Sequence, residues 1–103
     1  MQFFIDTANL AEIRAAMDMG LVDGVTTNPS LMSKEAADWR EIAREICRLV
    51  PGPVSLEVIA LDAEGMVREA KDLMQYGPNV VVKVPMTAEG LKAVRILKSM
   101  DKI

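Results

Sequence analysis

The sequence contains no histidine and only one cysteine, Cys47, among its 103 residues. Histidine is the commonest general base and the commonest metal ligand, so its absence argues against zinc and predicts no metal site. One cysteine cannot form an intrachain disulfide, and Cys47 falls in an amphipathic helical pattern, which favours a reducing compartment. The available chemistry is therefore that of carboxylates, lysines, hydroxyls, Tyr76 and this thiol.

Basic tracts and long apolar runs are also absent. The net charge is -3 and the two signs are interspersed, so no nucleic-acid partner and no anionic membrane surface is expected. No apolar run reaches the ~18 residues that a membrane span requires. The start "MQFFIDTANL" lacks the basic residues of a signal peptide, and we expect a cytoplasmic protein.

Four short β-rich runs alternate with helical stretches. This order predicts an α/β fold, (βα)₄, with parallel strands and right-handed crossovers, in a single domain over residues 1–103. The expected strands cover residues 2–6, 22–26, 54–60 and 80–85, and a fifth strand would begin at the terminal "MDKI".

Helix starts and inward faces follow from local patterns. Helix caps are expected at Asn9 (with Glu12 as a capping box), Ser33, Asp62 and Thr87. The spacing of apolar residues directs Leu91, Val94 and Leu97 of the last helix toward the core.

Polar residues recur near the carboxyl ends of the strands, where parallel α/β proteins bind ligands. Three strands carry Asp6, Glu57 and Lys83, and the second ends in "TTN", which offers Thr26 and Asn28. Because successive strand residues face opposite sides, these groups can share one face at matching depth.

Each residue also has a purely structural interpretation. Lys83 and Glu57 could form an ion pair, Asp6 could cap the turn "TAN", and Asn28-Pro29 is a turn signal. The repetition over four strands favours a site, because a core does not need one polar residue per strand.

A lysine inside the run "VVVKVP" suits a nucleophile. A free lysine has a pKa of about 10.4, so its amine is almost entirely protonated at neutral pH. Apolar burial disfavours the cation and activates lysines for Schiff-base chemistry, whereas nearby carboxylates oppose this. We expect the Lys83 amine to lie dry, facing the acids of strands one and three.

The motifs "FIDTAN", "GVTTNPSL", "SLEV" and "VVVKVPMTAEGL" together resemble the transaldolase family, in particular its small members related to fructose-6-phosphate aldolase. The similarity covers essentially the whole chain. It implies the first four units, an N-terminal half, of a TIM (β/α)₈ barrel. It also implies transfer of a dihydroxyacetone unit between sugar phosphates in the pentose phosphate pathway, with no cofactor or metal.

The resemblance gives each candidate residue a role. Lys83 is similar to the Schiff-base lysine, Asp6 to the aspartate that exchanges a proton with the C4 hydroxyl, and Glu57 to the glutamate that acts through a water. Asn28 and Thr26 match residues that hold the dihydroxyacetone moiety. Glutamate rather than glutamine at position 57 resembles the transferase branch. The alternatives are fructose-6-phosphate aldolase and a non-catalytic half-barrel scaffold.

The resemblance also implies a missing half. A complete barrel takes ~250 residues, and the family's phosphate-binding serine and arginine residues come from strands five to eight. An open sheet with apolar residues on both faces needs cover. We therefore expect a homo-oligomer, or pairing with a C-terminal half, or a chain truncated from a complete enzyme.

Overall fold

The structure is a computed structural model that describes residues 1–100, so the expected start of a fifth strand lies outside the described residues. Four strands form one parallel sheet in the order β1-β2-β3-β4. They are β1 (Phe4–Asp6), β2 (Gly24–Thr26), β3 (Val54–Glu57) and β4 (Val80–Lys83). The strands are shorter than expected, but the (βα)₄ order is confirmed and is that of half a TIM barrel.

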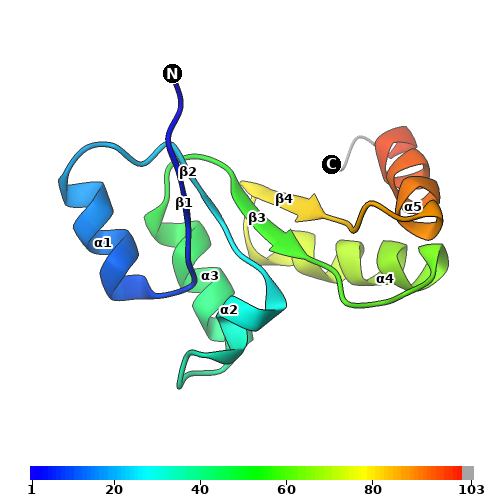
Figure 1. Cartoon of the computed structure of the whole chain (residues 1–103), viewed down its shortest axis with the longest axis horizontal. Helices are drawn as coiled ribbons and strands as arrows, with labels where there is room; N and C mark the ends of the chain where they lie inside the picture. Colours follow the sequence, from blue (N-terminus) through cyan, green and yellow to red (C-terminus); the bar gives the residue numbers. More distant parts are fainter. Residues whose placement is uncertain (101–103) are drawn as a thin grey trace.

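Helices connect consecutive strands, and one more helix follows β4 (Figure 1). They are α1 (Leu10–Asp18), α2 (Pro29–Ser33), α3 (Trp39–Leu49), α4 (Ala63–Leu73) with the short 3₁₀ helix η1 (Met74–Tyr76), and α5 (Ala88–Ser99). Within residues 1–100, none of these helices has both the length and the apolar character needed to cross a bilayer.

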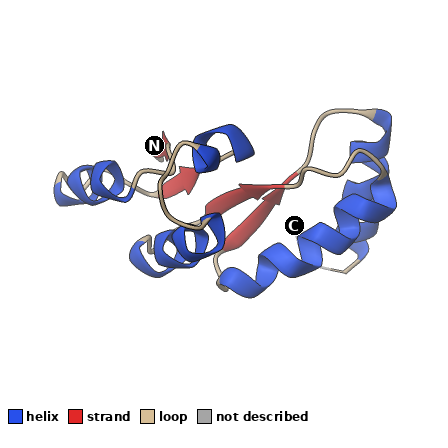
Figure 2. Ribbon diagram, turned by 90° about the horizontal axis from the view of Figure 1, so that it is seen from below, coloured by secondary structure: helices blue, strands red, loops and turns tan. Residues whose placement is uncertain are grey.

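One face of the sheet forms the core. Strand alternation turns Val25, Val54 and Leu56 toward the helices, where at most 2% of each residue is exposed. Ile13 of α1 and Ile46 of α3 are fully buried against this side. Figure 2 shows helices along one side of the strands. The apolar faces of α3 and α4 pack against the sheet, whereas α5 packs mainly against α4.

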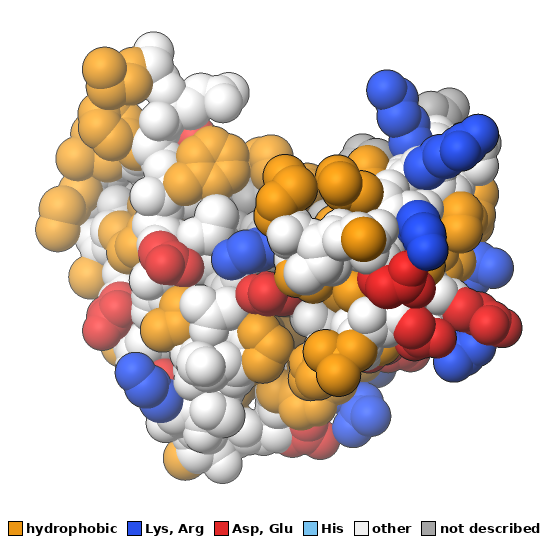
Figure 3. Space-filling view, turned by 45° about the vertical axis from the view of Figure 1, so that its right-hand side comes forward, with side chains coloured by type: hydrophobic (Ala, Val, Ile, Leu, Met, Phe, Trp, Pro, Cys, Tyr) orange, Lys and Arg blue, Asp and Glu red, His pale blue; other side chains and the backbone are white. Residues whose placement is uncertain are grey.

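The opposite face of the sheet is open. Phe4 and Val81, which point to this face, are 47% and 39% exposed. The Phe4 ring lies across β2 because residue 24 is glycine: a Cβ there would come within 2.4 Å of the ring. Figure 3 shows hydrophobic side chains exposed on the surface between charged groups. The open face of the sheet, to which Phe4 and Val81 point, is the one that a complete barrel would enclose.

The helix caps explain one difference from the sequence prediction. Asn9, Asp62 and Thr87 cap their helices as predicted, with side-chain oxygens that accept backbone N–H groups. Ser33 does not cap the long helix, because the chain forms α2 before it and α3 is capped by Asp38. The short α2 forms because the Asn28 side chain caps its N-terminus and proline occupies its first position.

The inward face of α5 also differs from the prediction. Leu97 is buried as expected, but Leu91 is 56% exposed, and the buried positions near the start of the helix are Gly90 and Ala93. A Cβ at position 90 would lie 1.8 Å from the carbonyl oxygen of Pro85. This close approach to the β4–α5 loop turns Gly90 inward, and the rotation moves Leu91 to the surface.

A single amide group joins α3 to the beginning of β4. Asn79 Nδ2 donates to the carbonyl oxygens of Cys47, Val50 and Gly52 at 3.1, 3.0 and 2.9 Å. The last carbonyl groups of a helix have no hydrogen-bond donors within the helix. The Asn79 side chain supplies such donors at the end of α3. Because the next residue begins β4, Asn79 also fixes where that strand starts.

We predict that Asn79→Ala lowers the free energy of unfolding by about 2–3 kcal/mol, because it leaves part-buried carbonyl groups without donors. Urea denaturation measures the loss. Ser33→Ala is the control, since its exposed hydroxyl bonds only to Ser30 within the same short helix. Equal stability of the two variants would contradict this role of Asn79.

Candidate active site

The register between β3 and β4 places Glu57 directly opposite Lys83. Both side chains point to the open face, and Lys83 Nζ lies 3.6 Å from Glu57 Oε2. The backbone N–H of Val58 donates to the Lys83 carbonyl oxygen at 3.1 Å, which holds the two strand ends together. The structure therefore brings the predicted nucleophile and one predicted acid into contact.

The expectation of a dry amine is wrong for this chain on its own. The Lys83 side chain is 45% exposed, whereas that of Glu57 is 23% exposed. The reason is geometric: both groups project from the open face, on which the described residues place no helix or further strand. Apolar burial of the amine requires cover on this face.

Asp6 and Thr26 form a second pair. They are opposite each other in the β1–β2 register, and the Thr26 hydroxyl donates to Asp6 Oδ1 at 3.0 Å. Following the register across the sheet, Thr26 lies opposite Ser55 and Ser55 opposite Val81. Asp6 therefore lies in the register row of Val81, two residues before Lys83.

The two pairs share a face but are not in contact. Asp6 forms no ion pair with Lys83 in the part of the chain that the structure describes. Neighbouring strands lie about 4.8 Å apart, so the three spacings from β1 to β4 separate the two backbones by about 14 Å along the sheet. On the open face, a gap therefore separates the Lys83–Glu57 pair from the Asp6–Thr26 pair.

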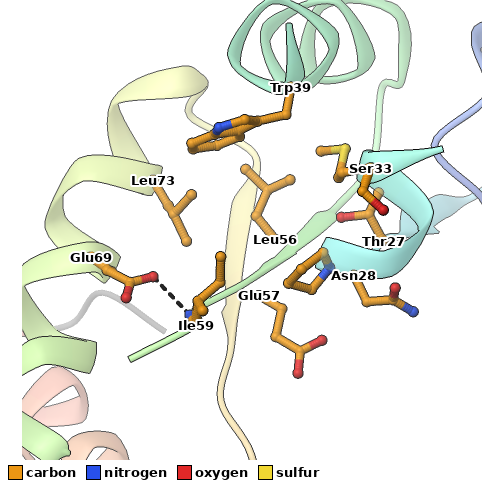
Figure 4. Close-up of a pocket in the computed structure, with 11 residues that line it drawn as sticks. Thr27, Asn28, Ser33, Trp39, Leu56, Glu57, Ile59, Glu69 and Leu73 are labelled. Carbon is orange, nitrogen blue, oxygen red and sulfur yellow. Dashed lines mark hydrogen bonds between the residues drawn. The ribbon is translucent and has the colours of Figure 1, made fainter. Parts of the chain in front are cut away.

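Asn28 has a structural role that the sequence did not reveal. Its Oδ1 accepts the backbone N–H of Leu31 at 2.9 Å and caps α2. In Figure 4 its side chain extends away from Trp39, as does that of Glu57. The cap fixes the Asn28 side chain at the carboxyl end of β2 and leaves its amide nitrogen as the remaining polar atom.

A cavity of about 350 Å³ lies on the helix side of β3. Its lining is mostly apolar and includes Trp39, Leu56 and Leu73. Figure 4 shows the Glu57 carboxylate pointing away from Trp39, on the other side of the strand from this cavity. Glu57 and Asn28 also belong to the lining, so the cavity borders the charged face at the carboxyl ends of β3 and β2.

Two other candidate nucleophiles lie in the core. Cys47 is 8% exposed, and burial raises the pKa of its thiol to about 11, so it stays protonated at neutral pH. Tyr76 is also 8% exposed and packs edge-on against Trp39, with ring centroids 5.7 Å apart. Lys83 is left as the nucleophile that this geometry favours.

Sequence reasoning missed Glu69 of α4. Its carboxylate accepts backbone N–H groups from the loop that follows Glu57. A side chain whose partners are backbone groups leaves no pattern in the sequence, and in the sequence a glutamate on an amphipathic helix resembles any solvated glutamate. Only the folded structure identifies it.

Comparison with known proteins shows the family of the chain. The family model "Transaldolase/Fructose-6-phosphate aldolase" matches residues 3–102. Probable transaldolases from Desulforapulum autotrophicum and Methanococcus vannielii are 64% and 62% identical over 97 residues. One from Aquifex aeolicus is 60% identical over 99 residues. The matches cover 94–96% of this chain but only 45–46% of each relative, so the chain spans about half their length.

We predict that Asn28→Ala lowers the free energy of unfolding by about 1 kcal/mol, because α2 loses its cap. Asn28→Asp, the matched control, keeps the capping oxygen and should stay within about 0.5 kcal/mol of the wild type. Urea denaturation compares the three proteins. A destabilisation by aspartate equal to that by alanine would show that the amide nitrogen, not the cap, is the stabilising group.

Proposed function

Because the chain belongs to the transaldolase/fructose-6-phosphate aldolase family, we propose that it supplies the lysine-bearing half of an active site that transfers a dihydroxyacetone unit between sugar phosphates. The observation that carries this proposal is the pairing of Lys83 with Glu57 on the open face of the sheet. A lysine amine next to a carboxylate provides both the nucleophile and a group that can move protons.

In the proposed reaction, the Lys83 amine attacks the C2 carbonyl of a ketose phosphate. Glu57, acting through a water, moves the protons as the carbinolamine forms and loses water to give the imine. The C3–C4 bond then breaks: its electron pair moves into the protonated imine to give an enamine, and Asp6 takes the C4 hydroxyl proton as the aldehyde leaves. The enamine carbon attacks an acceptor aldehyde, and the same steps in reverse release the new ketose.

The gap between the two pairs fits this division of roles. A lysine side chain from β4 and an aspartate side chain from β1 both project from the open face and can shorten the about 14 Å between the strands. What remains has the length of a few carbon atoms, which suits a substrate attached at C2 to Lys83 with its C4 hydroxyl at Asp6. Thr26 fixes the Asp6 carboxylate by its hydrogen bond, and the Asn28 amide nitrogen is a donor for the dihydroxyacetone hydroxyls.

The transferase is preferred to the aldolase within the family. The relatives reported above are probable transaldolases, and position 57 is glutamate in this chain. Holding the enamine until an acceptor arrives gives transfer, whereas protonating it and hydrolysing the imine releases free dihydroxyacetone and gives an aldolase.

The proposed site needs cover on the open face. The outer edges of β1 and β4 have no neighbouring strand among residues 1–100, and Phe4 and Val81 are exposed beside them. Parallel sheets are normally covered on both faces. We propose that four further parallel strands, from a second copy or from a C-terminal half, close the barrel, exclude water from Lys83 and add the phosphate-binding groups.

We predict that borohydride reduction in the presence of fructose 6-phosphate leaves a covalent adduct on the peptide that contains Lys83, because reduction traps the imine. Lys83→Met should abolish the adduct, whereas the control Lys92→Met should keep it, since Lys92 pairs with Glu89 on α5. Peptide mass mapping locates the adduct in the 103-residue chain and in a form with its barrel closed.

An adduct on a different lysine, or none in the closed form, would contradict the proposed nucleophile and favour a scaffold. Erythrose 4-phosphate serves as the acceptor in the same assay. Release of free dihydroxyacetone without this acceptor would replace the transferase with the aldolase.

We predict that the 103-residue chain associates at micromolar concentration, because its open face and two strand edges are unfavourable in water. Light scattering should give a mass of at least two chains. Val81→Asp places a charge on the open face and should shift the mass to one chain, whereas Met19→Asp, at an exposed helix end away from this face, should not. A wild-type mass of one chain would contradict self-association.

A further inference from the structure

The loop after Glu57 is held by a run of backbone hydrogen bonds. The N–H of Val58 donates to the Lys83 carbonyl at 3.1 Å. The next two N–H groups, of Ile59 and Ala60, donate to the two carboxylate oxygens of Glu69 at 2.8 and 2.7 Å. Figure 4 shows the bond from Ile59 to Glu69 next to β3. Three successive backbone donors directly after Glu57 are therefore satisfied.

Apolar packing fixes only the start of this loop, where Val58 is 4% exposed and lies in the core. Ile59 and Leu61, its large side chains, are 70% and 89% exposed. The far end of the loop is fixed by Asp62, which caps α4, and by Glu89 of α5, which accepts the N–H of Ala63 at 3.1 Å. Beyond Val58, the polar contacts of these carboxylates therefore fix the exposed part of the loop.

The Glu69 carboxylate binds the backbone of the loop rather than a basic side chain. No lysine or arginine forms a salt bridge with it among residues 1–100, whereas Glu64 on the same helix pairs with Arg68 at 3.3 Å. Hydrogen bonds to an ionised carboxylate are roughly twice as strong as neutral ones, and using both oxygens fixes direction as well as distance. The two bonded amides belong to the second and third residues after Glu57.

We propose that Glu69 is a positioning residue: by clamping the N–H groups of Ile59 and Ala60, it holds the end of β3 so that the Glu57 carboxylate stays beside the Lys83 amine. The link is direct, since Val58 connects Glu57 to the clamped residues and bonds to Lys83 itself. Without the clamp the end of β3 frays, and Glu57 moves relative to Lys83. This inference rests on the proposed function of Lys83 and Glu57.

The test compares Glu69→Gln with wild type and with the control Glu64→Gln, in the form with its barrel closed. Glutamine has the same shape but turns one of its two acceptors into a donor, which opposes the loop N–H it faces. Two quantities are measured: amide hydrogen exchange by NMR, and the rate of borohydride-trapped adduct formation at Lys83 with dihydroxyacetone as the ketone.

We expect Glu69→Gln to increase exchange at Ile59 and Ala60 by about tenfold or more, while the amide of Val82 in β4 stays protected. Adduct formation at Lys83 should slow by roughly tenfold to a hundredfold, as expected when a reacting group is misplaced by about 1 Å. Glu64→Gln should change neither quantity, because its carboxylate faces solvent and Arg68.

Each other outcome overturns the inference in a different way. Protected Ile59 and Ala60 amides in Glu69→Gln would mean that there is no clamp. Faster exchange with an unchanged adduct rate would mean that the clamp does not act on the site, while the proposed function stands. Loss of protection at Val82 would make Glu69 a determinant of overall stability. A wild-type protein without adduct at Lys83 in the closed form would remove the proposed function, and the positioning role with it.

Discussion

The hydrogen-bonded register between β3 and β4 determines what the open face of this half-barrel can do. It pairs Glu57 with Lys83 and turns both side chains away from the helices. Strand side chains alternate, so a slip of one residue would bury the amine among the helices and expose the Leu56 side of the sheet. That slip is unfavourable because the helix-facing side holds the buried core, and the same apolar core that stabilises the fold therefore orients the reactive pair.

The sequence predicted the order and type of the main elements, and it predicted which strand residues share a face. Alternation alone places Asp6, Thr26, Glu57 and Lys83 on one side, and the structure agrees. It could not give their depth, because the register between strands depends on loop lengths and packing rather than on any one strand. Asp6 consequently lies one row before Lys83.

Two further features could not be predicted from the neighbouring residues in the sequence: the short helix α2 and the exposure of Lys83. Asn28-Pro29 indicated a turn, but the same pair caps and begins α2, and that short helix moved the cap of the next helix from Ser33 to Asp38. The burial of Lys83 depends on what covers the open face, which its neighbours in the sequence do not encode. Its 45% exposure describes the half-barrel, and the dry environment that a Schiff-base lysine requires depends on the cover proposed for the open face.

The most direct test of this account is the scalar coupling across the hydrogen bond between the Val58 amide nitrogen and the Lys83 carbonyl carbon, measured by long-range HNCO NMR. The account predicts a cross-peak from Val58 to Lys83, which fixes the register that pairs Glu57 with the amine. A cross-peak from Val58 to Val82 or Val84 would place Glu57 and Lys83 in different rows or on different faces, and would contradict the proposed site.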